Sequence, residues 1–494
     1  MINRRAFLKL AGVAALMPWG CVPYRPGSAG VLLNDVHSGL NPTKVREVIA
    51  VRSLQDIRRA VDRAAAERLA ISVAGGRHAM GAQQFGTDTL HLDTRTYNRV
   101  LNLDSRSGLM EVEAGAQWPE LIRASLAMQE GSARQWGIVQ KQTGADRLSI
   151  GGALSANIHG RGLTLKPFVG DVEAFTLVMA DGRTLRCSRS EHAELFRLAV
   201  GGYGLFGIVS SVTVRLMPRQ KLRRVVELVN INEVMRRFEQ RIQEGFLFGD
   251  CQFAIDPASD DFLSRGIFSC YRPVDPATPI PDNQREIAEE QWLRLLYLAH
   301  ADKTKAFDVY SNEYVATNGQ LYWSDTHQMS YYPDGYHRSL DQRMRVFAPG
   351  SEMISELYVP RSELASFFAD MREDFRRHGT EVIYGTIRLI ERDDESFLAW
   401  ARQPWACTVL NLHVSHTPEG IERAAAAFRR LIDLARKRGG SYFLTYHKWA
   451  TREQVLACYP QLPEFLALKR RFDPEERFQS DWYRHYRTMF ADVL

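Results

Sequence analysis

The first 218 residues combine the two periods that hydrophobic residues follow in strands and in helices. Residues 71–74 are a short apolar run typical of a strand, whereas residues 53–68 repeat apolar side chains at helical spacing behind Ser53, a good capping residue. Residues 172–187 hold two apolar runs around an Asp-Gly pair, the pattern of a hairpin. Strands and helices therefore mix over residues 41–218, which predicts an α+β unit.

The rest of the chain is patterned as a second sheet with helices. Over residues 219–440 we expect strands at 354–360, 381–390 and 407–414 and helices at 283–301, 361–378 and 418–438. The tail, residues 441–494, begins with a predicted strand at 442–450. A change of pattern near residue 219 and again near residue 441 thus divides the chain.

The composition is that of a globular protein. Of 494 residues, 45% are hydrophobic and 24% are charged, which allows a sizeable core. The net charge of +5 comes from 63 basic and 58 acidic residues. This balance, without a basic stripe interleaved with aromatic residues, predicts no nucleic-acid partner.

The N-terminal segment, residues 1–30, differs from the rest. Arg4-Arg5 followed by a short apolar run resembles a twin-arginine export signal, which predicts a periplasmic protein that is transported folded. The apolar run is short for a membrane-spanning helix. The alternative is a cytosolic helix with a chance arginine pair. Cys21 follows Gly20 as at a lipoprotein cleavage site, and only lipidation there would attach the chain to a membrane.

The remaining cysteines argue against a metal site. Cys187, Cys251, Cys270, Cys407 and Cys458 are far apart and form no Cys-x-x-Cys pair, so we expect no metal. An oxidising compartment would permit a disulfide, and the nearest pair in the sequence is the second and third of these.

Residues 202–207, GYGLFG, match the Gly-x-Gly-x-x-Gly pattern of dinucleotide-binding folds. That mechanism needs a strand before the glycines and a helix after them. Here a helix-like stretch precedes them and a strand-like stretch follows, so we reject this interpretation.

The stretch ISVAGGRHAMGAQQ, residues 71–84, places a histidine in a glycine-rich turn. Small residues let the backbone approach a ligand closely, and glycine also permits a positive φ. His78 therefore either points at a bound ligand or is bonded to nearby backbone, and this stretch alone leaves both open.

Three segments, residues 71–84, 148–162 and 180–218, together resemble the FAD-binding domain of the vanillyl-alcohol oxidase family. The pattern is closest to that of alditol and gulonolactone-type oxidases and decaprenylphosphoryl-ribose oxidase. The resemblance implies a two-part PCMH-type FAD-binding domain, 41–218 with 441–494, and a cap, 219–440, with an antiparallel sheet flanked by helices.

In this family the backbone amide groups of glycine-rich turns bind the flavin pyrophosphate. The resemblance implies these cofactor-binding residues: Ala74, Gly75, Gly76, Arg77, His78, Ala79, Met80, Gln83, Gly144, Ser149, Gly151, Gly152, Ser155, Asn157, Gly160, Ile208 and Val209. The last two lie either along the flavin or in the strand core. A histidine at the position of His78 bonds covalently to the flavin in many members, which raises its oxidising power. Residues 131–150 contain no cysteine for a second bond.

The resemblance also implies residues that face the substrate: His159, Arg388, His413, His447 and Lys448. A lysine near the flavin would stabilise negative charge on the reduced ring. In alditol oxidase a Glu-x-Arg pair holds the substrate, whereas here Thr386 replaces the glutamate. The alternatives are a surface ion pair for the arginine, structural roles for the histidines and a solvated strand end for the lysine.

We therefore expect an FAD-dependent enzyme that oxidises a CH–OH group of a sugar, polyol or lactone-like small molecule. Hydride would pass to flavin N5, and His159, His413 or His447 would remove the proton. Oxygen or another electron acceptor would reoxidise the flavin. Oxidation of a C–N bond or a lipid-linked sugar, or a catalytically silent flavin-binding protein, are the alternatives.

Overall fold

The computed structural model describes residues 30–330, 332–333 and 335–494. The predicted export signal, with Arg4, Arg5 and Cys21, lies outside the described residues, so periplasmic export stays a prediction. Among the helices that the structure describes, none combines the length and the apolar character needed to cross a membrane.

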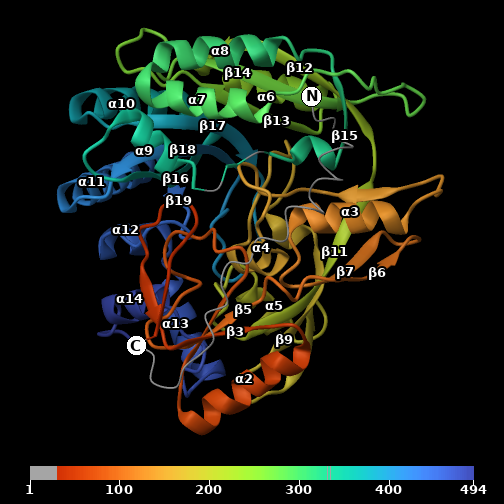
Figure 1. The fold of residues 1–494 in the computed structure, drawn as a ribbon, viewed down its shortest axis with the longest axis vertical. Coiled ribbons are helices and arrows are strands. Elements are labelled where there is room, and N and C mark those ends of the chain that lie inside the picture. The colour runs from red at the N-terminus through yellow and green to blue at the C-terminus, as the bar shows by residue number, and fades with distance from the viewer. Residues whose placement is uncertain (1–29, 331, 334) are drawn as a thin grey trace.

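A small parallel sheet lies in the lower half of the molecule in Figure 1, above helix α2. Its order is β3 (Glu47–Ala50), β5 (Leu90–Asp93), β4 (Ile71–Ala74), and β1 (Val31–Leu33) pairs with β2 (Thr43–Val45) nearby. Helix α2 (Leu54–Glu67) connects β3 to β4, two parallel strands that lie on either side of β5. Ser53 caps this helix by accepting the Asp56 N–H, as predicted.

A second, antiparallel sheet follows, in the order β10-β9-β11-β7-β6 with β8 beside β11. Its strands are β6 (Val100–Asp104), β7 (Leu109–Glu113), β8 (Trp136–Ile138), β9 (Val172–Val178), β10 (Thr184–Ser188) and β11 (Ile208–Pro218). The helices between them are α3 (Trp118–Met128), α4 (Ile150–Ala156) and α5 (Ala193–Ala199). Because α5 precedes residues 202–207 and β11 follows them, the rejection of a dinucleotide motif there is confirmed.

The largest sheet has eight antiparallel strands, in the order β15-β12-β14-β13-β17-β18-β16-β19. They are β12 (Lys221–Asn230), β13 (Phe248–Phe253), β14 (Arg265–Pro273), β15 (Leu321–Trp323), β16 (Gly350–Pro360), β17 (Val382–Ile390), β18 (Trp405–Ser415) and β19 (Ser441–Tyr442). The helices are α6 (Val234–Gln243), α7 (Glu289–Ala301), α8 (Lys303–Val315), α9 (His337–Met344), α10 (Leu364–His378) and α11 (Pro418–Arg436). Helices α10 and α11 pack against β16, whereas α7 packs against β17 and α8 against β12.

The tail departs from the predicted strand at residues 442–450, which was wrong beyond Tyr442. After β19 the backbone turns to the first glycine-rich turn instead, where Thr445 accepts the Met80 N–H at 3.2 Å. Helices α12 (Arg452–Cys458), α13 (Leu462–Phe472) and α14 (Asp481–Met489) then run down beside the N-terminal strands (Figure 1). The tail thus joins both ends of the molecule.

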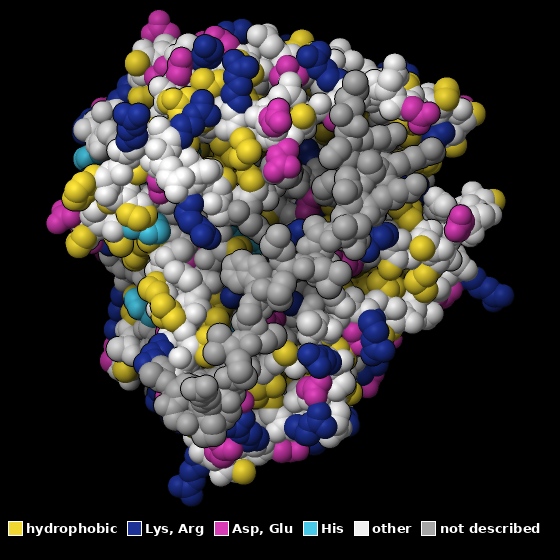
Figure 2. Space-filling view, in the orientation of Figure 1, with side chains coloured by type: hydrophobic (Ala, Val, Ile, Leu, Met, Phe, Trp, Pro, Cys, Tyr) yellow, Lys and Arg dark blue, Asp and Glu magenta, His cyan; other side chains and the backbone are white. Residues whose placement is uncertain are grey.

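The five cysteines that the structure describes are all buried and free. Cys251 and Cys270 lie on adjacent strands but are not directly opposite, since Cys251 faces Phe268 in the register. The disulfide considered for this pair is therefore not formed. On the face drawn in Figure 2, acidic and basic side chains are interspersed over the surface.

Candidate functional site

A cavity of about 2260 Å³ is lined by residues of the N-terminal part, 41–218, and by residues of the eight-stranded sheet. Ligand pockets usually measure about 300–1,000 Å³, so this cavity can hold a large cofactor and a substrate together. Its walls include the turn after β4, the start of α4, strands of the large sheet, and helices α7 and α8.

The glycines of the first turn are required by close packing. A Cβ on Gly75 would lie 2.0 Å from Ser149 Oγ, and one on Gly76 would lie 2.3 Å from the Arg147 carbonyl oxygen. The left-handed residue of this turn is Arg77, with φ of 59°. The two glycine-rich motifs therefore touch each other, and only hydrogen at these Cα atoms leaves room for that contact.

The same turn presents backbone amide groups to the cavity. Within the described part of the chain, the N–H groups of residues 76–79 make no hydrogen bond, although all four residues line the cavity. Successive free N–H groups of this kind form an anion-binding concavity. Gln83 fixes the turn by accepting the Gly81 N–H and donating to the Leu444 carbonyl.

His78 lines the cavity and is also bonded to its surroundings. Its Nδ1 lies 2.8 Å from His37 Nε2, and its Nε2 lies 3.1 Å from the Arg147 carbonyl oxygen. Burial lowers the pKa of His78 well below its usual range, with the neighbouring His37 as the second cause. The ring is therefore neutral at physiological pH.

The second glycine motif is the helix α4 rather than a turn alone. Ser149 Oγ accepts the Gly152 N–H at 3.3 Å and so caps the helix. A Cβ on Gly151 would lie 2.9 Å from the Ala114 side chain, which explains the small residue there.

Most of the predicted cofactor residues line the cavity: Ala74, Gly75, Gly76, Arg77, His78, Ala79, Met80, Gln83, Gly144, Ser149, Gly151, Gly152, Ser155 and Val209. Three lie elsewhere. Asn157 donates to Asp393 at 2.8 Å and closes the end of α4, and Ile208 is packed in the core against Val178. Gly160 is not among the lining residues and packs on the Lys141 backbone.

Of the predicted substrate-facing residues, His159 and Arg388 line the cavity and three others do not. His413 lies two positions beyond the lining residue Asn411 on β18, where its ring is 5.5 Å from the ring of His300. His447 and Lys448 line a separate cavity of about 210 Å³ beside Asp481.

The correction for His447 and Lys448 has a simple physical cause. The prediction assumed that residues 442–450 are a strand that returns to the flavin, but the strand ends at Tyr442. The tail residues that line the large cavity are instead Phe443, Thr445 and Tyr446.

The structure adds a central carboxylate that sequence reasoning missed. Glu356 on β16 is buried, lines the cavity and lies with Oε1 2.5 Å from His159 Nε2. Oε1 also accepts the Tyr358 hydroxyl at 2.7 Å, and Oε2 accepts the Tyr446 hydroxyl at 3.2 Å. A charged residue inside the apolar run 354–360 was the available signal.

Glu356 is ionised despite its burial. Burial by itself raises the pKa of this carboxyl, but His159, the Tyr358 hydroxyl and the charge of Arg388 together lower it below its usual value. His159 Nδ1 faces the Gly160 carbonyl at 3.1 Å and must carry a proton to donate. Nε2 lies 2.5 Å from Glu356 Oε1, so one proton lies between these two atoms.

Glu356 lies level with Thr386, the position at which the resemblance implies a glutamate. In the sheet, Val409 on β18 is opposite Glu356 on one side and opposite Thr386 on the other. The three positions are level across three strands. Glu356 thus lies two strands away from Thr386, and the charge of Arg388 is close enough to lower the pKa of Glu356.

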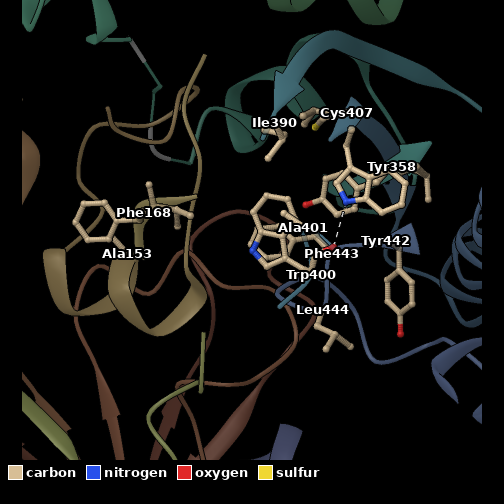
Figure 3. Close-up of a cluster of buried hydrophobic side chains, with 14 of the residues drawn as sticks. Ala153, Phe168, Tyr358, Ile390, Trp400, Ala401, Cys407, Tyr442, Phe443 and Leu444 are labelled. Atoms are coloured by element: carbon tan, nitrogen blue, oxygen red, sulfur yellow. Dashed lines mark hydrogen bonds between the residues drawn. The ribbon is translucent and has the colours of Figure 1, made fainter. Parts of the chain in front are cut away.

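An aromatic cluster packs against His159 and Tyr358, the partners of Glu356. Tyr358 stacks on Trp400 with ring centroids 4.7 Å apart, and Phe443 lies 5.0 Å from the same indole. Figure 3 shows these three side chains gathered together. The His159 ring lies 5.4 Å from Trp400, so the wall fixes the imidazole against Glu356.

The geometry fits FAD. The free amide groups of residues 76–79 suit a pyrophosphate, the Gly75–Ser149 contact has no space for a larger residue, and the cavity exceeds the size of a single small ligand. Comparison with known proteins agrees: the FAD binding domain family matches residues 45–188. This chain carries a PCMH-type FAD-binding domain. The match spans both glycine motifs and confirms the predicted family.

The chain is also similar to several oxidoreductases. An uncharacterised oxidoreductase of Rhodococcoides fascians is 30% identical over 34% of this chain and 37% of its own length. The L-gulono-1,4-lactone dehydrogenase of Mycobacterium tuberculosis is 22% identical over 81% and 86%. The decaprenylphosphoryl-β-D-ribose oxidase of Mycolicibacterium smegmatis is 22% identical over 91% and 96%. Residues 45–188 thus match an FAD-binding domain, and the named relatives are oxidoreductases.

Proposed function

We propose that this flavoprotein oxidises a CH–OH group of a sugar, polyol or lactone-like small molecule. The observation that carries the proposal is the buried group of Glu356, His159 and Arg388 in the wall of the FAD cavity. The names of two relatives, a lactone dehydrogenase and a phosphoryl-sugar oxidase, support a sugar-like substrate. A silent flavin-binding protein would have no need of a paired carboxylate and imidazole there.

The roles of the residues follow from their positions. The amide groups of residues 76–79 would hold the pyrophosphate of FAD, which when bound accepts a hydride from carbon. Arg388 has a buried Nε without a hydrogen-bond partner among the described residues, and it would orient a substrate oxygen. The Glu356–His159 pair would take the hydroxyl proton as the hydride leaves. Oxygen or another acceptor would then collect the electrons.

Anaerobic mixing tests this function directly. Sugars, polyols and aldonolactones are added in turn to the purified holoprotein without oxygen, and the visible flavin absorbance is followed. We expect at least one of these classes to bleach the flavin. If only amines do so, the C–N alternative replaces the proposal, and if no compound does so, the silent alternative replaces it.

A lipid-linked sugar is the second candidate, because the cavity continues along apolar residues of two helices. Leu295, Leu296 and Ala299 on α7 and Ala306 and Phe307 on α8 line it. An isoprenoid or acyl chain would fit such a wall. Bleaching by a lipid-linked sugar but not by the free sugar would favour this candidate.

We further propose that FAD is attached covalently through His78, which lines the cavity at the turn that the resemblance marks. Acid precipitation of the holoprotein should leave the flavin on the polypeptide. His78→Ala should release it into the supernatant while still binding FAD, because the amide groups of the turn remain. Free flavin in the wild-type supernatant would contradict the bond.

A further inference from the structure

A second cluster of polar residues lines the same cavity, where the eight-stranded sheet forms its wall. The chemistry proposed above does not use this cluster. We call it the Tyr271 pocket: Arg161, Arg224, Asp250, Tyr271 and Tyr314. All five residues line the cavity, and the two arginines and the aspartate are more than nine-tenths buried. They come from β12, β13, β14, α8 and the segment that follows His159.

Backbone contacts place Arg161 on the large sheet. Its carbonyl accepts the Gly249 N–H at 2.8 Å, and the Leu163 N–H donates to the Leu247 carbonyl at 2.9 Å. The segment after the second glycine motif therefore runs along β13. This holds the Arg161 guanidinium near the Tyr271 ring, which Arg224 also approaches.

The two guanidinium groups share one aromatic ring. The Cζ atoms of Arg161 and Arg224 lie 5.6 and 5.5 Å from the centroid of Tyr271, and that of Arg224 lies 4.2 Å from Tyr314. Arg224 donates to the hydroxyls of Ser269 and Thr317, at 3.0 and 2.9 Å. These partners are neutral, so they fix the cation without neutralising it.

The pocket holds more positive than negative charge. Asp250 is its one carboxylate, 3.6 Å from Arg161 Nη1, and two guanidiniums against one carboxylate leave one positive charge. Arg161 Nε and Asp250 Oδ1 are both buried and without a hydrogen-bond partner among the described residues. Arg161 Nη2 donates to the His327 carbonyl at 2.8 Å, so Nε is the donor left unused. Burying an uncompensated charge is costly, and an unused buried donor adds to that cost.

An oxyanion would remove both costs. Guanidinium groups bind phosphate and carboxylate groups through paired N–H donors, and stacking on an aromatic face holds their planes in position. We propose that the Tyr271 pocket binds an anionic group of the substrate, a phosphate or a carboxylate, so that the enzyme acts on a charged sugar derivative. This inference rests on the proposed function, because it names the class of substrate for the same cavity.

Inorganic phosphate added to the holoenzyme tests the pocket without any substrate. Because FAD fills the glycine-turn site, phosphate should raise the melting temperature through the Tyr271 pocket alone. Arg224→Gln and Arg161→Gln should each abolish this saturable rise. The matched control is Arg123→Gln, since Arg123 lines the same cavity but is exposed on α3. Arg224→Lys keeps the charge and should retain part of the effect.

A kinetic arm separates phosphate from carboxylate and tests the link to function. Ribose, ribose 5-phosphate and ribonate are compared as anaerobic reductants of the flavin. One of the two charged compounds should have a KM about 10- to 100-fold below that of ribose. This ratio corresponds to the usual contribution of hydrogen bonds to a charged group. Arg161→Gln should remove that advantage with little change in the limiting rate.

The outcomes distinguish the two proposals. A phosphate effect on stability that depends on both arginines, without flavin reduction by any sugar, would keep the pocket and contradict the proposed function. No phosphate effect, or the same effect in the arginine variants as in Arg123→Gln, would overturn the pocket. Flavin content and far-UV circular dichroism show whether each variant is folded, and a variant that is not folded is replaced by the other.

Discussion

Gly75→Ala is expected to lose most of its FAD. The new Cβ would lie 2.0 Å from Ser149 Oγ and 2.6 Å from Ser149 Cβ, far inside contact distance. Ser149 caps α4, so it cannot move away without disturbing the second glycine motif. Overpacking of this kind costs about 1–3 kcal/mol, and here it separates the two motifs that form the cofactor site. We expect flavin per polypeptide to fall roughly five- to 150-fold under subsaturating FAD.

Gly170→Ala is the matched control. Its added Cβ would meet only Lys166 Cβ, at 3.5 Å, which is an ordinary contact, and Gly170 does not line the cavity. This variant should keep wild-type flavin content, measured from visible absorbance per polypeptide after reconstitution with limiting FAD. Full flavin content in Gly75→Ala would show that the contact between the motifs is not needed for binding.

The cofactor side of the site was predictable because its signals are local. The residues around Gly75 and Ser149 form short glycine-rich motifs, and a missing side chain at a close approach leaves a direct mark in the sequence. The predicted helix at 53–68 and hairpin at 172–187 likewise depend on neighbouring residues, and both are present in the structure. The antiparallel strands at 354–360, 381–390 and 407–414 are present as parts of β16, β17 and β18.

The substrate side depends on which strands are neighbours, and this the sequence does not show. Glu356 and Arg388 are 32 positions apart in the sequence. They line the same cavity because their strands, β16 and β17, both pair with β18. The prediction for Lys448 failed for a related reason. It assumed a regular strand, whereas the tail leaves the sheet after Tyr442 to hold Met80 through Thr445. Helices α8 and α9 were missed because their aromatic and polar residues do not follow a clear helical period.

The Tyr271 pocket illustrates the same limit. Arg161 was next to a predicted site residue in the sequence, but Arg224 and Asp250 lie in strands that carry no motif. Their charges become informative only once β12, β13 and β14 are adjacent and both guanidiniums face one ring. An excess of buried charge is a property of the folded chain.

Glu356→Gln is expected to slow flavin reduction by about 10²–10⁴-fold, the usual contribution of a general base. Glutamine has nearly the same shape, but its oxygen is a weak base and its NH₂ group donates where the site already has donors. Glu356 now accepts from Tyr358 and Tyr446 and shares a proton with His159. The variant therefore loses both the negative charge and the place for the substrate proton. FAD content should not change, because Glu356 lies outside the two glycine motifs.

The matched control for this prediction is Glu352→Gln, which changes a second buried glutamate on the same strand. Glu352 also lines the cavity, but it lies four residues away, roughly 13 Å along an extended strand, and its partners are Tyr336 and Asn411. Stopped-flow reduction under anaerobic conditions, with any substrate that bleaches the wild type, measures both variants. The flavin of Glu352→Gln should be reduced at a rate within about tenfold of wild type, because this variant leaves the Glu356–His159 pair intact. Wild-type rates in Glu356→Gln, or equal losses in both variants, would remove Glu356 from the chemistry and leave His159 as the base to test.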